Sequence, residues 1–294
     1  MLIGLASPLS MLYNLFLSTS TIPSDRKHSV ITPIFKKYSS NDPSNYRPIT
    51  STCIASKITE GCIKNEVIAY MCKVGFISKH QHGFLAKHST VTQMFECVND
   101  CSFTLNICHS VDVIYVGFAK VFDKVVHPIL VFKLQSYGID SLVLKWIEQF
   151  LIHRLQCVRV NGYYSSFIAV LNEVSQRNVL RPILFLIFIN DICDVIRECS
   201  VKLFADDVKL YVDISCNNYY LILQEAITFL HNCTNEWQLE ISYNKCKVLH
   251  LGAQHQHADH HLGYLNQVLL RVPKIRVFSL TPNLNSKHYV LTFT

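Results

Sequence analysis

The chain has 294 residues, half of them hydrophobic, which is enough apolar material for the core of one or two domains. Glycine is scarce at 9 residues and no low-complexity tract occurs, so the composition excludes a largely disordered chain. A formal net charge of +6 is compatible with a polyanionic partner but does not by itself indicate one.

The N-terminal segment and the cysteines bear on the cellular compartment. Residues 1–17 are apolar, but they lack a basic start and contain Pro8, so we expect a buried helix rather than a secretory signal. The segment is also too short to span a bilayer. The twelve cysteines include no C-x-x-C pair, and they suit neither a disulfide framework nor a zinc site. We therefore expect an intracellular protein of the nucleus or cytoplasm that is not secreted and has no membrane partner.

Hydrophobic periodicity and turn residues predict an alternation of helices and strands. Proline after His127 and glycine at 138 delimit one helix, and Asn161-Gly162 marks a hairpin. The order predicts an α+β fold with helices on one face of an antiparallel sheet. The predicted helices are 1–20, 51–72, 89–106, 127–138, 141–151, 179–197 and 219–237, and the predicted strands are 29–35, 111–116, 156–160, 163–170, 201–205, 208–212 and 248–251.

Two adjacent carboxylates, Asp206 and Asp207, lie between the apolar–polar alternations of 201–205 and 208–212. Period-2 patterning on both sides of a tight turn predicts strand, turn and strand. Two carboxylates at a hairpin tip repel each other unless a cation binds there, and Mg²⁺ prefers such oxygen ligands. A solvated turn is the alternative, because aspartate is common in turns. This pair by itself leaves both interpretations open.

Six motifs occur in an order that resembles a known enzyme family. The chain looks like the fingers and palm of a reverse transcriptase from a non-LTR (LINE-type) retrotransposon, over about residues 7–288. One short motif alone would be weak support, but six in the same order make chance a poor explanation. The motifs are Asn45-Tyr46-Arg47-Pro48-Ile49, Gln81-His82-Gly83-Phe84, 120–125 with His127, 179–191, Phe204-Ala205-Asp206-Asp207 and Asn244-Lys245-Cys246.

The resemblance implies a right-hand polymerase in which an antiparallel palm sheet is backed by helices. Fingers would occupy residues 1–110 and the palm 111–252, while 253–294 would be a degenerate palm and primer-grip end with an incomplete or absent thumb. No endonuclease segment is expected before Met1. The implied partners are an RNA template, a DNA primer and deoxynucleoside triphosphates, and the implied cofactor is Mg²⁺, two ions in the family. The oligomeric state does not follow from the sequence.

The resemblance also assigns roles to individual residues. Asp206 and Asp207 would be the catalytic metal ligands, and Lys245 would donate a proton to pyrophosphate. Arg47 with Lys37 or its neighbour Lys36 would bind the triphosphate, since guanidinium and ammonium groups suit phosphate. Phe122 would exclude a ribose 2′-hydroxyl, and Gln176 would complete the nucleotide-binding set. The alternatives are a solvated basic loop for the cations and ordinary core packing for Phe122.

Three departures from the family pattern argue against full activity. Gly117 stands where the family has the first palm aspartate, and neither Asp112 nor Asp123 is placed to replace it. The glycine-rich loop at 173–182 has lost its glycines, with Arg177 and Arg181 at two of their positions, which we interpret as decay rather than as new phosphate contacts. The primer-grip turn at 274–279 is shortened or lost.

We therefore expect a reverse-transcriptase domain that is catalytically impaired or inactive. Three alternatives stay open at this point. The chain could be an active but divergent RNA-directed DNA polymerase, a non-catalytic nucleic-acid-binding module, or a translated relic without a selected role. The first alternative needs a ligand to replace the missing carboxylate, and the second needs affinity for template and primer that falls with salt.

Overall fold

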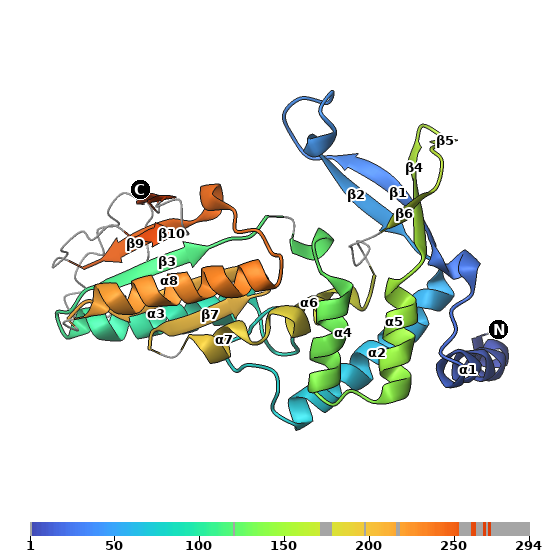
Figure 1. Cartoon of the computed structure of the whole chain (residues 1–294), viewed down its shortest axis with the longest axis horizontal. Helices are drawn as coiled ribbons and strands as arrows, with labels where there is room; N and C mark the ends of the chain where they lie inside the picture. Colours follow the sequence, from blue (N-terminus) through green and yellow to red (C-terminus); the bar gives the residue numbers. More distant parts are fainter. Residues whose placement is uncertain are drawn as a thin grey trace, which may run out of the picture. The chain divides into compact units, whose positions relative to one another are not determined.

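The computed structural model describes residues 2–119, 121–170, 178–196, 198–215, 218–252, 260–262, 267–268 and 270–271 (Figure 1). The chain is a mixed α+β protein, as its sequence predicts. It divides into two compact units, Met1–Ile77 with Lys120–Ile189 and Ser78–Ala119 with Asn190–Thr294. These two units do not coincide with the fingers, palm and primer-grip regions expected from the sequence. The boundaries of those three regions stay a prediction.

The first unit combines a helical group with a small sheet. In chain order its main elements are α1 (Leu2–Ser18), β1 (His28–Phe35), β2 (Tyr46–Ser51), α2 (Ile54–Lys73), α4 (His127–Ser136), α5 (Ser141–Leu151), β4 (Arg154–Val160), β5 (Tyr163–Tyr164), β6 (Ile168–Val170) and α6 (Arg181–Ile189). Short 3₁₀ turns occur at Ser24–Lys27, Pro43–Asn45 and Val121–Asp123.

Helix α5 shows how local sequence sets an element and its buried face. The Asp140 carboxylate caps the helix by accepting the backbone N–H of Leu142 at 2.8 Å. Apolar residues recur at helical spacing from Leu142 to Leu151, and Trp146, Ile147, Phe150 and Leu151 form one buried stripe. Leu142 in the first turn is exposed, so the stripe begins one turn later than its sequence pattern suggests.

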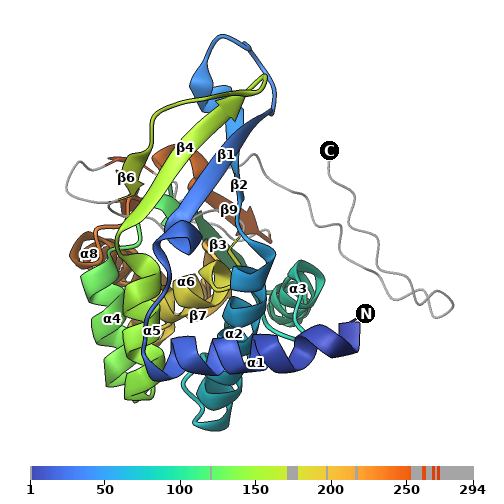
Figure 2. The same ribbon diagram turned by 90° about the vertical axis from the view of Figure 1, so that its right-hand side faces the viewer.

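The sheet of the first unit has the strand order β2-β1-β4-β5, and β6 also pairs with β4. Strands β1 and β2 are antiparallel, whereas β1 and β4 are parallel. Residues 36–153 separate the two strands, so the connection is long enough for a parallel pair, which a short hairpin could not join. The predicted hairpin around Asn161-Gly162 is confirmed by the antiparallel pairing of β4 with β5. Figure 2 shows these strands from the side.

The N-terminal helix forms as predicted, but the expectation that it is buried is wrong. Met11 and Leu15 are 72% and 55% exposed, and α1 contacts α5. Its apolar residues are spread around the whole helix, so one neighbouring helix cannot cover them all. Among the described residues, no helix combines the length and apolar character needed to cross a membrane.

The second unit is built on a mixed sheet with the order β12-β9-β3-β8-β7. The predicted antiparallel pairing holds for β3, β7, β8 and β9, while β12 adds a parallel pair at one edge. Its elements are α3 (Thr90–Asn106), β3 (Val111–Val116), α7 (Ile192–Val195), β7 (Ser200–Phe204), β8 (Asp207–Asp213), α8 (Tyr219–Glu236), a 3₁₀ turn at Tyr243–Lys245, β9 (Lys247–Leu251), β10 (His261–Leu262), β11 (Gln267–Val268) and β12 (Leu270–Arg271).

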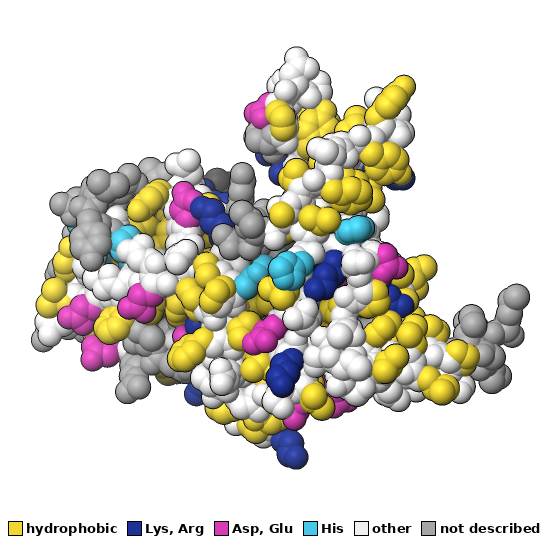
Figure 3. All heavy atoms as spheres, turned by 45° about the vertical axis from the view of Figure 1, so that its right-hand side comes forward, with side chains coloured by type: hydrophobic (Ala, Val, Ile, Leu, Met, Phe, Trp, Pro, Cys, Tyr) yellow, Lys and Arg dark blue, Asp and Glu magenta, His cyan; other side chains and the backbone are white. Residues whose placement is uncertain are grey.

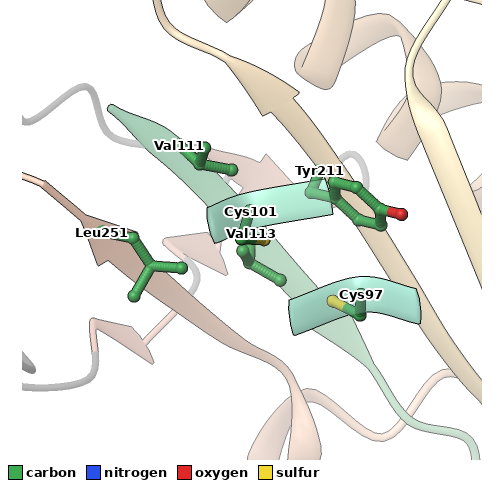
Figure 4. Packing of buried hydrophobic residues seen from close by; sticks show 6 residues of the cluster. All are labelled: Cys97, Cys101, Val111, Val113, Tyr211 and Leu251. Atoms are coloured by element: carbon green, nitrogen blue, oxygen red, sulfur yellow. The ribbon is translucent and has the colours of Figure 1, made fainter. Parts of the chain in front are cut away.

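Helices cover both faces of this sheet, so the prediction of helices on one face is wrong. Helix α3 packs through Cys97 and Cys101 on one face, where the core also contains Val111, Val113, Tyr211 and Leu251 (Figure 4). Helix α8 lies on the opposite side of β3, as Figure 2 shows. The near-continuous apolar run of β3 is the sequence signal for a strand that is buried on both faces.

The predicted helix at 179–197 is divided into α6 and α7. The break falls at Asn190, whose side-chain oxygen accepts the backbone N–H of Ser78 at 3.0 Å. The chain passes from the first unit to the second at this point. Asn190 and Asp191 are the polar residues that interrupt the apolar run at this break, and the prediction of one helix passed over them.

Glu60 on α2 predicts a pH dependence of stability in the first unit. Burial raises its pKa above the ordinary 4.5, although N–H bonds from Val179 and Leu180 and the charge of Arg154 lower it. The folded state then binds this proton more tightly, so the unfolding free energy falls as pH rises above about 4.5. Glu60→Gln keeps an acceptor for the Val179 N–H, which lies 2.7 Å from Glu60 Oε2, and should flatten this dependence in urea unfolding from pH 4.5 to 7.5. Identical pH profiles for the two proteins would contradict this assignment.

Candidate functional site

The two predicted carboxylates lie at the tip of the β7–β8 hairpin. Ala205 and Asp206 form the turn, and Phe204 pairs with Asp207 in the antiparallel register. Ala205 has a φ of +52°, a left-handed conformation that is uncommon outside glycine. Asp207 is exposed and Asp206 is half-buried. Burial raises the pKa of Asp206, and the like charge of Asp207 raises it further, while a backbone hydrogen bond and Lys245 lower it.

Gly117 lies beside this turn at the end of the neighbouring strand. The β3–β8 register pairs Val116 with Val208, so the next step places Gly117 opposite Asp207. Gly117 is buried, and its carbonyl accepts the backbone N–H of Ser242 at 2.8 Å. The position expected to supply a carboxylate is therefore adjacent to the Asp-Asp pair, and it carries no side chain.

Neither of the two nearby aspartates considered from the sequence takes over this position. Asp112 lies five residues back on β3 and therefore on the opposite face of the strand. It is buried and lies 2.6 Å from His250 Nδ1, so its carboxylate already has a partner away from the turn. The side chain of Asp123 lies outside the described residues.

Lys245 fills the space that a side chain at position 117 would need. A Cβ added to Gly117 would lie 2.8 Å from Lys245 Cβ and 3.1 Å from its Cδ. The ammonium group donates a hydrogen bond to the carbonyl of Phe118 at 2.7 Å. The predicted proton donor is thus bound to backbone, and its aliphatic stem lies over the glycine. It is a neighbour of Asp206, whose pKa it lowers.

The side chain of Gln81 stabilises the turn that carries Asp206 and Asp207, a role that the sequence did not indicate. Its side-chain oxygen accepts the backbone N–H groups of Gly83 at 2.7 Å and Ala205 at 3.0 Å. The side chain is 2% exposed. On either side of it, His82 N–H donates to Leu203 O and Leu203 N–H donates to His80 O, both at 2.9 Å. This buried amide therefore fixes the left-handed Ala205 and with it the direction of the turn.

Gly83 allows this segment to approach the hairpin closely. A Cβ at this position would lie 2.4 Å from the backbone nitrogen of Ala205 and 3.0 Å from its Cα. Both are backbone atoms that cannot rotate away. The motif Gln81-His82-Gly83-Phe84 was the only sequence signal for this contact, and it showed the spacing of the residues but not their partner.

The predicted nucleotide-binding residues Arg47, Lys37 and Phe122 lie in the first unit. Arg47 is exposed on β2, and the ammonium of Lys37 lies 4.7 Å from the centre of the Tyr38 ring. The Phe122 ring is half-buried, 4.4 Å from the Phe185 ring. Their roles toward a nucleotide stay predictions.

Arg181, at a position where the family pattern has glycine, is buried with its guanidinium 4.9 Å from the centre of the Phe122 ring. It therefore packs in the core of the first unit, which argues against a phosphate contact. Gln176, the loop at 173–177 and the expected primer-grip turn at 274–279 lie outside the described residues.

The oxygen ligands of Asp206 and Asp207 suit one hard cation such as Mg²⁺. They do not suit a pair of ions, because Gly117 at the end of β3 supplies no bridging carboxylate and the space beside it holds the side chain of Lys245, from the turn at Tyr243–Lys245. Within the described part of the chain, no group of three or more His, Cys, Asp or Glu side chains is arranged to hold a metal ion. The donor set therefore falls short of a two-metal centre.

Comparison with known proteins gives one family. The sequence profile described as "Reverse transcriptase (RNA-dependent DNA polymerase)" matches residues 34–269, which is more than half of the chain. The match includes the β7–β8 turn, Gly117, Lys245 and Gln81.

Similar curated proteins come from mobile elements of Drosophila melanogaster. The probable RNA-directed DNA polymerase from transposon BS is 27% identical over 252 residues, which cover 81% of this chain and 27% of the relative. The RNA-directed DNA polymerase from mobile element jockey is 27% identical over 253 residues, with the same coverage of each chain. The probable enzyme from transposon X-element is 25% identical over 215 residues, 71% of this chain and 24% of the relative. The chain thus spans about a quarter of the length of these relatives.

Proposed function

Because this chain belongs to the reverse transcriptase (RNA-dependent DNA polymerase) family and is similar to non-LTR retrotransposon enzymes, we propose that it is a fingers-and-palm region with impaired or no polymerase activity. The proposed substrates are an RNA template, a DNA primer and deoxynucleoside triphosphates, with Mg²⁺ as the cofactor of the family. In this proposal the second unit contributes the palm with Asp206 and Asp207, and the first unit contributes the fingers with Arg47 and Lys37.

Gly117 is the observation that carries the proposed loss of activity. Two-metal polymerases use carboxylates from two neighbouring strands to hold the ions that activate the attacking and leaving oxygens. The register places residue 117 opposite Asp207, where such a carboxylate would stand, but glycine offers no ligand. Removing one charge-stabilising group from a reacting centre typically costs about 10²–10³ in rate. A carboxylate shared by two ions should matter at least as much.

Primer extension on an RNA template, with Mg²⁺ or Mn²⁺, tests this proposal. The natural chain should extend the primer no better than a control with Asp206→Asn and Asp207→Asn, because the intact pair still lacks its partner. Template and primer should nevertheless bind. Robust extension by the natural chain that the control loses would overturn the proposed inactivity and support an active, divergent polymerase.

A non-catalytic nucleic-acid-binding role is the second candidate, and the charge of the first sheet favours it. Residues 28–51 and 154–170, which contain this sheet and its loops, include five Lys and Arg but only one acidic residue, Asp42. Such an excess of positive charge suits a phosphate backbone. This role would be supported by binding of template–primer that weakens linearly with log salt while extension stays absent.

A further inference from the structure

A small cavity lies in the first unit where three helices meet the start of a strand. It is bordered by Phe16 near the end of α1, by the segment 22–26, by α2 and α5, and by Arg154 at the start of β4. Its volume is about 20 Å³, slightly more than the ~10–15 Å³ that one water molecule needs, and it opens to solvent on one side. The cavity therefore admits a group as small as a carboxylate, but not a nucleotide.

The lining of this cavity combines apolar and polar side chains. Phe16, Ile22 and Pro23 supply apolar surface, and Figure 3 shows hydrophobic side chains gathered on α1, at the right of the view. Thr52, which follows β2, and Ser56 on α2 add hydroxyl groups. A mixed lining of this kind suits a ligand with an apolar body and one polar group.

Two polar atoms of the lining are buried without a partner. Within the described residues, neither Trp146 Nε1 nor Thr52 Oγ1 has a hydrogen-bond partner, although Trp146 is only 3% exposed. An indole N–H can only donate, and a buried donor without an acceptor is costly. A ligand with acceptor oxygens in the cavity would satisfy both groups.

The charge of the cavity favours an anion. Its lining contains two arginines, Arg26 and Arg154, but only one acidic residue, Glu60. The Arg26 guanidinium lies 4.6 Å from the centre of the Phe16 ring, and no carboxylate in the described part of the chain lies within ion-pair distance of it. The neighbouring Lys27 is buried, and burial and then the charge of Arg154 lower its pKa. Positive charges are thus crowded here, and a bound anion would offset them.

We infer that this cavity binds the carboxylate of a small monocarboxylic acid. The carboxylate accepts hydrogen bonds from the Arg26 guanidinium, the Trp146 N–H and the Thr52 hydroxyl. The short apolar stem of the acid packs on Phe16 and Pro23. The site goes beyond the proposed function, because it lies in the first unit and uses none of the residues proposed for nucleotide or metal binding.

Fluorine NMR of the full chain with trifluoroacetate, a small carboxylate with an apolar body, tests the inference. The trifluoroacetate signal should broaden saturably, and sodium acetate should reverse the broadening, whereas sodium chloride at the same ionic strength should not. Trifluoroethanol has the same apolar body without the carboxylate, so its signal should stay sharp at the same concentrations.

Two variants with matched controls locate the site. Trp146→Phe keeps a ring but removes the N–H, and Arg26→Gln removes the charge, so each should weaken trifluoroacetate binding about tenfold or more, as for loss of a hydrogen bond to a charged group. Trp237→Phe makes the same change in the second unit, and Arg159→Gln removes an exposed arginine of β4. Both lie outside the cavity and should leave the Kd within about twofold, since distant sites act independently.

Three results would overturn the inference. The first is no saturable broadening up to about 50 mM trifluoroacetate, where a site of millimolar Kd would be nearly full, and a cavity that holds only water gives this result. The second is equal binding of trifluoroethanol. The third is an equal loss of affinity in a variant and its control. Arg26 lies in a 3₁₀ turn and is only half-buried, so Arg26→Gln decides the question if Trp146→Phe fails to fold.

Discussion

Gly83→Ala is expected to lower the free energy of unfolding of the second unit by about 3 kcal/mol, at the upper end of the usual range for overpacking. The added methyl group would lie 2.4 Å from the backbone nitrogen of Ala205, and backbone cannot rotate aside. The segment must then move away from the hairpin and break the hydrogen bonds from Gly83 and Ala205 to Gln81. Urea unfolding measures the loss, and amide exchange at Ala205 should accelerate.

Gly61→Ala is the matched control, because it makes the same chemical change within a helix. A Cβ at Gly61 has no heavy atom within 4 Å, and the residue lies in the middle of α2. Alanine is favoured over glycine there by about 1 kcal/mol, so stability should stay unchanged or rise. A Gly83→Ala protein as stable as the natural chain, with slow exchange at Ala205, would show that the segment does not press against the turn.

The β7–β8 turn depends on parts of the chain that are distant in sequence. Its left-handed residue is Ala205, and alanine is strained in this backbone conformation, whereas glycine would not be. The amide of Gln81, 124 residues away, offsets this cost by accepting the Ala205 N–H in a buried setting where an unpaired donor would be expensive. The direction of the Asp206 and Asp207 side chains is therefore set by the segment at 80–83 as much as by the hairpin itself.

Local patterns predicted the elements around the site well. Alternation on both sides of Asp206 and Asp207 gave a hairpin, and β7 and β8 have that form. The apolar run at 111–116 gave the central strand β3. Each of these rests on residues a few positions apart, and the periodicity of side chains is fixed by the backbone geometry of a strand.

Long-range contacts were beyond the reach of such patterns. The sequence showed that Gly117 lacks a carboxylate, but it could not show that Lys245 occupies the vacated space, because that depends on the turn at 243–245 meeting the end of β3. It showed Gln81 within a motif without revealing its bonds to Ala205. The sequence also did not determine which face of the β-sheet α3 covers, since Cys97 and Cys101 alone do not identify the strand residues that they contact.

Gly117→Asp alone is expected to destabilise the second unit by about 1–3 kcal/mol, because its Cβ would lie 2.8 Å from that of Lys245. Adding Lys245→Gly removes all the crowding side-chain atoms and should recover much of this loss, which a double-mutant cycle would report as coupling of about 1–3 kcal/mol. Urea unfolding of the natural chain, both single variants and the double variant provides the measurement. Additive effects would show that the two positions do not meet.

The double variant should also bind Mn²⁺ at least tenfold more tightly than the natural chain. It places a third carboxylate beside Asp206 and Asp207, and it removes the neighbouring ammonium charge. Gly117→Asn with Lys245→Gly is the control, since it has the same shape without the new charge, and it should recover stability without this gain. Equal Mn²⁺ affinity in the two double variants would mean that position 117 does not limit metal binding. Even with the metal bound, primer extension should stay below that of an intact enzyme, because residues 173–177 contain no glycine and the double variant lacks Lys245, the proposed proton donor.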